Sequence, residues 1–172
     1  MSDAKATFLS LAAVAILLMA QPPAAEAKTL VYCAEASPDT FDPAIASGVR
    51  DASATAIYNR LVEFKPGTTS VGPGLAESWE VSPDGLQYTF HLRRGVKFQA
   101  TDEFTPTRDM NADDVIFTFD RQMNPANPYH TYADRPYVYF EGVGMPKLIS
   151  GWRKIDDYTL VLTLPAPHAP MI

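Results

Sequence analysis

The chain has 172 residues, 47% of them hydrophobic, which excludes disorder throughout and is enough apolar material for one modest globular unit. Fourteen Lys and Arg residues against twenty Asp and Glu give a net charge of −6, and this lack of basic excess excludes nucleic acid as a partner. Fifteen prolines argue against a coiled coil and for a loop-rich mixed fold.

Residues 1–27 have the three parts of a secretory signal peptide. Lys5 supplies the positive charge, residues 8–20 form a mostly apolar segment, and residues 25–27 (Ala-Glu-Ala) form a small-x-small cleavage site. A retained membrane anchor is the alternative, but a spanning helix needs about 20 apolar residues and this segment is shorter. We therefore expect cleavage before Lys28 and export of a soluble, mildly acidic protein.

Cys33 is the one cysteine of the sequence. In an oxidising compartment an unpaired cysteine is either buried and inert or available to a partner that this chain does not carry, and the residues leave both open. Lipid attachment is not expected, because Val31 and Tyr32 stand where a lipoprotein site has small residues. A catalytic thiol is not expected, because no histidine forms a recognisable motif with Cys33.

The first part of the mature chain predicts a strand and a helix. Residues 29–32 are β-rich and predict a short buried strand. Asp42-Pro43 then interrupts the chain. Apolar residues at helical spacing, behind Asp51 as a possible N-cap, predict a helix over residues 52–62.

A β-hairpin is predicted next. Trp79 and Val81 alternate with polar neighbours and predict its first strand, and the apolar members of residues 88–92 alternate in the same way. Residues 82–85 (Ser-Pro-Asp-Gly) between them have the chemistry of a tight turn.

The clearest predicted helix begins at Asn111, a good N-cap with Asp114 three residues on as a near capping box. Its apolar face recurs at helical spacing as far as Met123, and Asn124-Pro125 ends it. A loop rich in proline and tyrosine is predicted to about Lys147. Apolar alternation around Asp156-Asp157 then predicts a second hairpin, which ends at Pro165.

No catalytic or metal-binding pattern stands out. The adjacent pairs Asp113-Asp114 and Asp156-Asp157 fit capping and turn roles better than acid–base catalysis, because neighbouring carboxylates do not converge on one bond. His91, His130 and His168 are widely separated and lack metal-ligand spacing. We therefore expect no enzyme and no cofactor, and interpret His91 as the solvent-side residue of a strand.

Two segments are candidates for ligand recognition. The loop of residues 127–139 carries four tyrosines, which suit recognition because they combine an apolar face with a hydroxyl, although such tyrosines can simply cover a core edge. The small residues Ala46, Ser47, Gly48 and Val49 precede a predicted helix, so a ligand could approach exposed backbone N–H groups there; an ordinary connection is the alternative.

Several segments together resemble the solute-binding protein family 5 of ABC importers, and within it the members that bind dipeptides. The resemblance extends over residues 28–172 and is most specific in Gly-Leu-Ala-Glu-Ser-Trp followed by Tyr-Thr-Phe-His-Leu-Arg. The segments that carry it are residues 29–33, 58–64, 73–81, 88–98 and 111–115.

The resemblance implies an α+β or α/β fold of the periplasmic binding protein type II kind, present only in part. Residues 28–56 would begin the first ligand-binding lobe, and residues 57–172 would form most of an accessory α+β domain that is truncated at its C-terminus. The implied function is that of an exported, periplasmic substrate-binding subunit that binds dipeptides or oligopeptides and delivers them to a membrane permease. It implies ligand contacts at Ala46 to Val49 and at Tyr129, and a disulfide partner for Cys33 that this chain lacks.

Two other interpretations stay open. The apolar end at Met171-Ile172 also fits a truncated product that does not transport and has only an interaction role or none. A small secreted hydrolase would rest only on scattered His and Asp residues.

Overall fold

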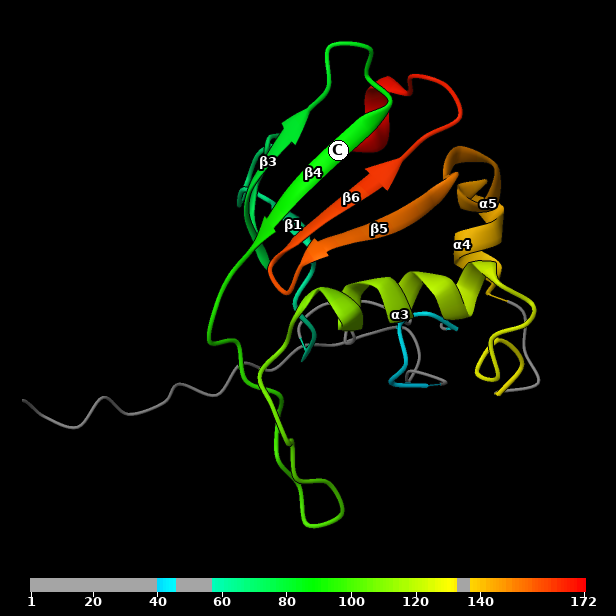
Figure 1. Ribbon diagram of the computed structural model, residues 1–172. Helices are drawn as coiled ribbons and strands as arrows, with labels where there is room; N and C mark the ends of the chain where they lie inside the picture. Colours follow the sequence, from blue (N-terminus) through cyan, green and yellow to red (C-terminus); the bar gives the residue numbers. More distant parts are fainter. Residues whose placement is uncertain (1–39, 46–56, 133–136) are drawn as a thin grey trace, which may run out of the picture. The chain divides into compact units, whose positions relative to one another are not determined.

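The computed structural model describes residues 40–45, 57–132 and 137–172, all within one unit, Ala34–Ile172. Its centre is a four-stranded antiparallel sheet in the order β3-β4-β6-β5 (Figure 1). The strands are β3 (Ala76–Val81), β4 (Gln87–Leu92), β5 (Gly151–Asp156) and β6 (Thr159–Thr163). The fold is therefore mixed α and β, as the sequence predicts.

Both predicted hairpins are confirmed. In the first, Trp79 pairs with Phe90 across β3 and β4, and the turn between the strands is closed by the Ser82 hydroxyl, which donates to Asp84 Oδ1 at 2.5 Å. Gly85 takes φ +69° in this turn, a conformation that a residue with a Cβ rarely adopts. The second hairpin joins β5 to β6, and β6 completes the sheet by pairing with β4.

The helix α3 (Ala112–Met123) lies beside β5 against the sheet (Figure 1). Its capping box is complete: the Asn111 side chain accepts from the backbone at the first turn, and the Asp114 carboxylate accepts from Asn111 N–H at 2.9 Å. The helix packs through Phe119, whose ring stacks on Trp152 of β5 at 4.5 Å between centroids. The predicted helix, its start and its end are confirmed.

The core lies between α3 and the sheet. Along β4 the buried side chains alternate with more exposed ones, whereas three consecutive residues of β6, Leu160 to Leu162, are buried. Phe90 and Leu160 pair across the two strands. The buried hydrophobic residues are Ala76, Tyr88, Phe90, Leu92, Met110, Ala112, Val115, Tyr137, Phe140, Ile149, Leu160, Val161, Leu162 and Leu164.

The prediction of a loop from Pro125 to Lys147 is wrong in its second half. Two short helices, α4 (Val138–Gly142) and α5 (Met145–Leu148), lie there, separated by Gly144 at φ +80°. Helices of one turn show no 3.6-residue periodicity, so the pattern does not reveal them. Tyr137, just before α4, is 1% exposed and belongs to the core.

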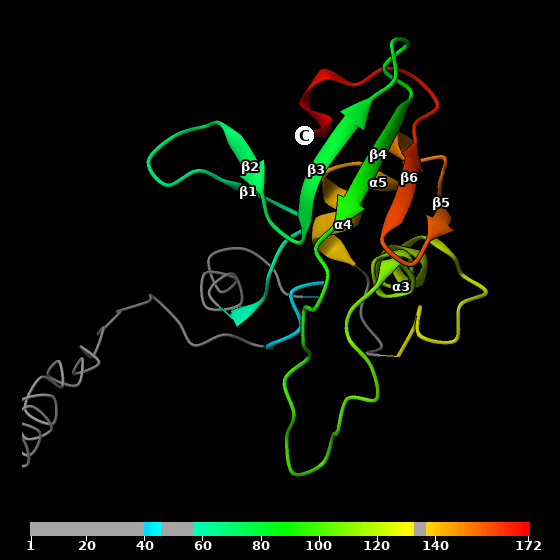
Figure 2. The same ribbon diagram turned by 60° about the vertical axis from the view of Figure 1, so that its left-hand side comes forward.

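The predicted helix over residues 52–62 is wrong at its C-terminal end. Val62 begins β1 (Val62–Phe64), which pairs with β2 (Val71–Pro73) beside the β3 side of the sheet (Figure 2). The carbonyls of Arg60 and Leu61 accept from Leu75 and Ala76 N–H groups at 2.8 and 2.9 Å, so these residues form long-range bonds and not helical ones. Residues 52–56 of that predicted helix, together with the strand of residues 29–32, lie outside the described residues.

The chain after β6 reaches a 3₁₀ turn, η2 (Ala169–Met171), and Met171 and Ile172 pack against the core. In contrast, the long connection from β4 to α3 extends away from the sheet in both views (Figures 1 and 2). Among the described residues no helix is both long and apolar enough to cross a membrane.

Candidate functional site

Tyr129 stands on the loop that follows α3, with its backbone fixed on both sides. Its N–H donates to Asn127 Oδ1 at 2.9 Å, and its carbonyl accepts from the Tyr137 hydroxyl at 2.9 Å. Asn127 is itself tied to α3, because its side-chain amide donates to Asp120 Oδ2 at 2.6 Å. These bonds therefore anchor the loop to α3 and, through Tyr137, to the core.

The ring of Tyr129 remains available on the surface. It is 53% exposed and meets Phe117 of α3 edge-on, at 5.4 Å between centroids and 77° between ring planes. An aromatic ring held in this way can contact a ligand with little loss of conformational entropy. The structure thus presents the ring of this predicted site residue on the surface.

A second feature of the same region is the short turn at Asp42. Its carboxylate accepts from Ala44 N–H at 2.9 Å, and its carbonyl accepts from Ile45 N–H at 3.3 Å. The Asp42 carboxylate also accepts from the Tyr132 hydroxyl. In addition, it accepts from both terminal nitrogens of Arg121, and these two bonds are 3.2 Å long. One side chain therefore joins residues 40–45 to α3 and to the loop of Tyr129.

The guanidinium of Arg121 is engaged in the pair with Asp42. Its side chain is 18% exposed, and its Nε is buried without an acceptor in the described part of the chain. The Arg121 carbonyl accepts from His130 Nδ1 at 2.8 Å, which requires the tautomer protonated at Nδ1. The residue next to Tyr129 is thus bonded to the same arginine that holds Asp42.

The charges of this cluster are stable at neutral pH. Burial would raise the pKa of Asp42, but hydrogen bonds from Tyr132, Ala44 and Arg121 outweigh it, so this pKa lies below the ordinary 3.8. Burial and the neighbouring carboxylate raise the pKa of Tyr132 above its ordinary 10.0. Asp42 is therefore a carboxylate that accepts from a protonated Tyr132.

The structure describes one of the two predicted recognition segments. Tyr129 is described, whereas Ala46, Ser47, Gly48 and Val49 lie outside the described residues, as does Cys33. Ile45, the last described residue before Ala46, belongs to the turn that Asp42 ties to Arg121. The chain that leads into the first segment is thus attached beside the second.

Sequence reasoning missed Asp42, Arg121 and Tyr132 as a group. Asp42 was interpreted only through its proline neighbour, as a break in the chain. Its partners lie 79 and 90 residues away, and no local pattern pairs residues so distant. The tyrosine-rich composition of the loop was the one available signal.

The four tyrosines of this loop have different roles. Tyr137 is buried and covers the core, whereas Tyr139 is 64% exposed on α4. Tyr132 binds Asp42, and Tyr129 presents its ring. Core cover therefore applies to Tyr137, whereas surface recognition stays a prediction for the exposed Tyr129.

The paired aspartates have the predicted capping and turn roles. Asp113 and Asp157 both bind Lys154, at 2.8 and 2.7 Å, and so join the start of α3 to the second hairpin. Asp156 accepts from Tyr158 N–H at 2.7 Å, which lowers the pKa of its carboxyl. No group of three His, Cys, Asp or Glu that could hold a metal is found among residues 40–45, 57–132 and 137–172.

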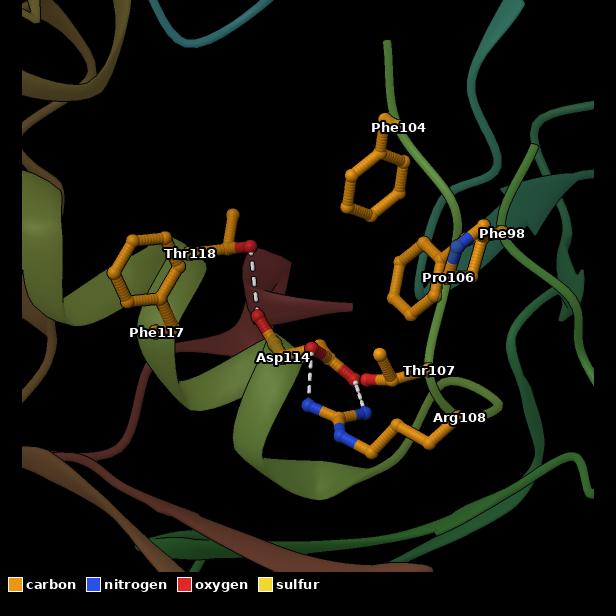
Figure 3. Close-up of a pocket in the computed structure, with 8 residues that line it drawn as sticks. All are labelled: Phe98, Phe104, Pro106, Thr107, Arg108, Asp114, Phe117 and Thr118. Atoms are coloured by element: carbon orange, nitrogen blue, oxygen red, sulfur yellow. Dashed lines mark hydrogen bonds and ion pairs between the residues drawn. The ribbon is translucent and has the colours of Figure 1, made fainter. Parts of the chain in front are cut away.

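A shallow groove of about 360 Å³ lies between α3 and the connection that precedes it (Figure 3). Phe98 and Phe104 approach from the connection, and Phe117 and Thr118 line the groove from the helix. Its polar side is occupied by Arg108, which binds the capping residue Asp114 at 2.6 and 2.8 Å. Since that ion pair already serves the helix N-terminus, we assign the groove no ligand.

Comparison with known proteins agrees with this architecture. The model of the family described as bacterial extracellular solute-binding proteins, family 5 Middle, matches residues 70–172. The chain is 58% identical over 149 residues to the dipeptide-binding protein of Escherichia coli, and 54% identical over 138 residues to heme-binding protein A of Haemophilus influenzae. These matches cover 86% and 79% of this chain.

A solved structure is also similar. The ABC transporter-associated periplasmic binding protein DppA of Helicobacter pylori, in complex with the peptide STSA, superposes with a TM-score of 0.72 at 44% identity. The match covers 80% of this chain and 27% of that one. The chain likewise spans about 28% of the E. coli relative and 25% of the H. influenzae relative.

The fold and these matches place the chain among the bacterial extracellular solute-binding proteins. The chain belongs to the bacterial extracellular solute-binding proteins of family 5, as the resemblance in its sequence predicts. Its relatives are named for binding, and none of those described here is named as an enzyme.

Proposed function

We propose that this chain is the N-terminal portion of a substrate-binding subunit of an ABC importer, and that it binds dipeptides or oligopeptides for transport. The observation that carries the proposal is the 58% identity to the E. coli dipeptide-binding protein over 86% of this chain. The H. pylori neighbour, which is in complex with a peptide, supports the same ligand class. The heme-binding relative is 54% identical to this chain, so the sequence of this portion does not by itself distinguish a peptide from heme as the ligand.

The proposed division into domains follows the resemblance to the family. Residues 28–56 begin a ligand-binding lobe, and residues 57–172 form most of an accessory α+β domain. Backbone N–H groups of Ala46 to Val49 face the ligand, and Tyr129 contacts it with its exposed ring. Pairing with the backbone of an extended peptide gives affinity that depends little on side chains, which suits a carrier of varied peptides.

The proposed mode of action is binding and delivery without chemistry. Residues 1–27 direct export to the periplasm, where the loaded protein delivers its peptide to a membrane permease. Binding needs no cofactor in this scheme. A secreted hydrolase has no support in the site, because the paired aspartates are engaged in capping and turns.

A chimaera tests the proposal. The matching segment of this chain replaces its counterpart in the E. coli dipeptide-binding protein, and calorimetric titration with a set of dipeptides follows. We expect affinity within about tenfold of the unmodified E. coli protein, because the exchanged segment supplies an equivalent part of the site. A chimaera that folds, as judged by circular dichroism and cooperative melting, and yet binds no peptide would refute the proposal.

A further inference from the structure

We propose that Asp42, Arg121 and Tyr132 are positioning residues of the ligand site. They hold residues 40–45 against the loop that carries Tyr129, and so fix the position of this loop and of the proposed ligand contact at Tyr129. This inference rests on the proposed function of that contact, but the attachment itself can be tested without a ligand.

The first support is the geometry of the attachment. Arg121 and Asp42 form a two-pronged pair, with Nη1 to Oδ2 and Nη2 to Oδ1 both at 3.2 Å. Such parallel bonds fix orientation as well as distance. Tyr132 adds its hydroxyl to the same carboxylate and places its ring 5.5 Å from the Arg121 guanidinium carbon.

The second support is that the attachment is sheltered from solvent. The Arg121 and Asp42 side chains are 18% and 24% exposed. In contrast, the Lys97 side chain in its pair with Asp109 is 77% exposed. A partly buried and geometrically matched pair holds its partners more firmly than an exposed one, which water and salt screen.

The third support is that the polar groups of Arg121 bind other residues of this same chain. Both terminal nitrogens of Arg121 bind Asp42, and its carbonyl holds His130, the residue after Tyr129. Little of the guanidinium is left for a ligand carboxylate. Arg121 therefore acts on a ligand only through what it positions.

Hydrogen–deuterium exchange on the full chain tests the attachment. Arg121→Gln removes the pair but keeps the local turn, in which Ala44 N–H donates to Asp42. We expect amide exchange in residues 40–45 to rise at least tenfold, while β4 and β6 stay protected. Arg108→Gln is the matched control, because Arg108 forms a similar two-pronged pair at the other end of α3. Unchanged exchange in residues 40–45 would overturn the inference.

Peptide titration of the chimaera then tests positioning. Arg121→Gln should weaken binding about tenfold and Tyr132→Phe less, whereas Arg108→Gln should change it less than twofold. Combining Asp42→Asn with Arg121→Gln should add little to either change alone, because both break one interaction. Full affinity in Arg121→Gln, or simple additivity of the pair, contradicts positioning. A parent chimaera that binds no peptide refutes the proposed function, while the exchange experiment still decides whether the attachment exists.

Discussion

Phe119 of α3 stacks on Trp152 of β5, with 4.5 Å between the ring centroids and 25° between the ring planes. Phe90 of β4 lies 6.0 Å from the same indole, so one tryptophan joins the helix to two strands of the sheet. Lys154 ties the same pair of elements through Asp113, at 2.8 Å. The orientation of α3, and with it the loop that carries Tyr129, depends on this contact.

Replacement of Phe119 should therefore destabilise the fold strongly. Phe119→Ala removes the stacking partner of Trp152 and leaves a cavity between α3 and β5, which costs about 2–4 kcal/mol for a partly buried ring. Urea unfolding followed by Trp fluorescence measures the loss. Phe117→Ala, on the 43% exposed neighbour, serves as control and should cost less than about 1 kcal/mol. Equal losses in the two variants would show that the stack is not the main contact.

The turn at Gly85 offers a test of backbone conformation. Gly85 has φ +69°, and a Cβ added there would meet Pro167 at 3.4 Å, so Gly85→Ala should destabilise the chain by about 1–2 kcal/mol. Gly151→Ala is the control, since no heavy atom lies within 4 Å of its added Cβ. That substitution should be neutral or slightly stabilising. Thermal melting compares the two, and an equally stable Gly85→Ala variant would contradict the assigned turn.

The ion pair at Asp42 predicts a particular dependence on pH. Because the folded-state pKa of Asp42 is depressed, its contribution to stability is present above the unfolded value near 3.8 and is lost as the pH falls through the lower folded value. The groups that face it are Arg121, which stays charged, and Tyr132, which stays protonated in this range.

The measurement is the free energy of unfolding of the parent and of Asp42→Asn, from urea titrations between pH 2 and pH 7. The parent should be more stable near neutral pH, and the difference should shrink toward zero at the acid end. The comparison with a variant matters because Asp84, Asp114 and Asp156 also have lowered pKa values and contribute to acid sensitivity of both proteins. If the difference in free energy of unfolding between the parent and Asp42→Asn did not vary with pH, the Asp42 carboxylate would not be the group that stabilises the fold at neutral pH.

Local signals predicted both hairpins and the helix α3. Asn111 and Asp114 predict the start of α3 within four residues of sequence. The alternation of apolar and polar residues on both sides of Asp84-Gly85 predicts a hairpin. Each of these elements is stabilised by bonds between near neighbours. Capping residues, turn residues and apolar periodicity all lie within one element, so the local sequence is enough to predict such elements.

The failures have two physical causes: α4 and α5 are too short to show helical periodicity, and other segments are held by long-range bonds. Residues 58–61 have helical spacing, yet the carbonyl of Leu61 bonds to Ala76, fifteen positions away, and the helix gives way to a strand. The candidate site shows the same limit. Tyr129 was predicted from the resemblance to a family, whereas the pair of Asp42 and Arg121 exists only through tertiary packing.

The most direct test of the account is calorimetric titration of dipeptides into the chimaera carrying Tyr129→Ala or Tyr139→Ala. Both rings are more than half exposed, at 53% and 64%, so neither change should disturb the core. The account predicts at least tenfold weaker binding for Tyr129→Ala and less than a twofold change for Tyr139→Ala. Binding unchanged in both variants, or weakened equally in both, would contradict the placement of the ligand site at Tyr129.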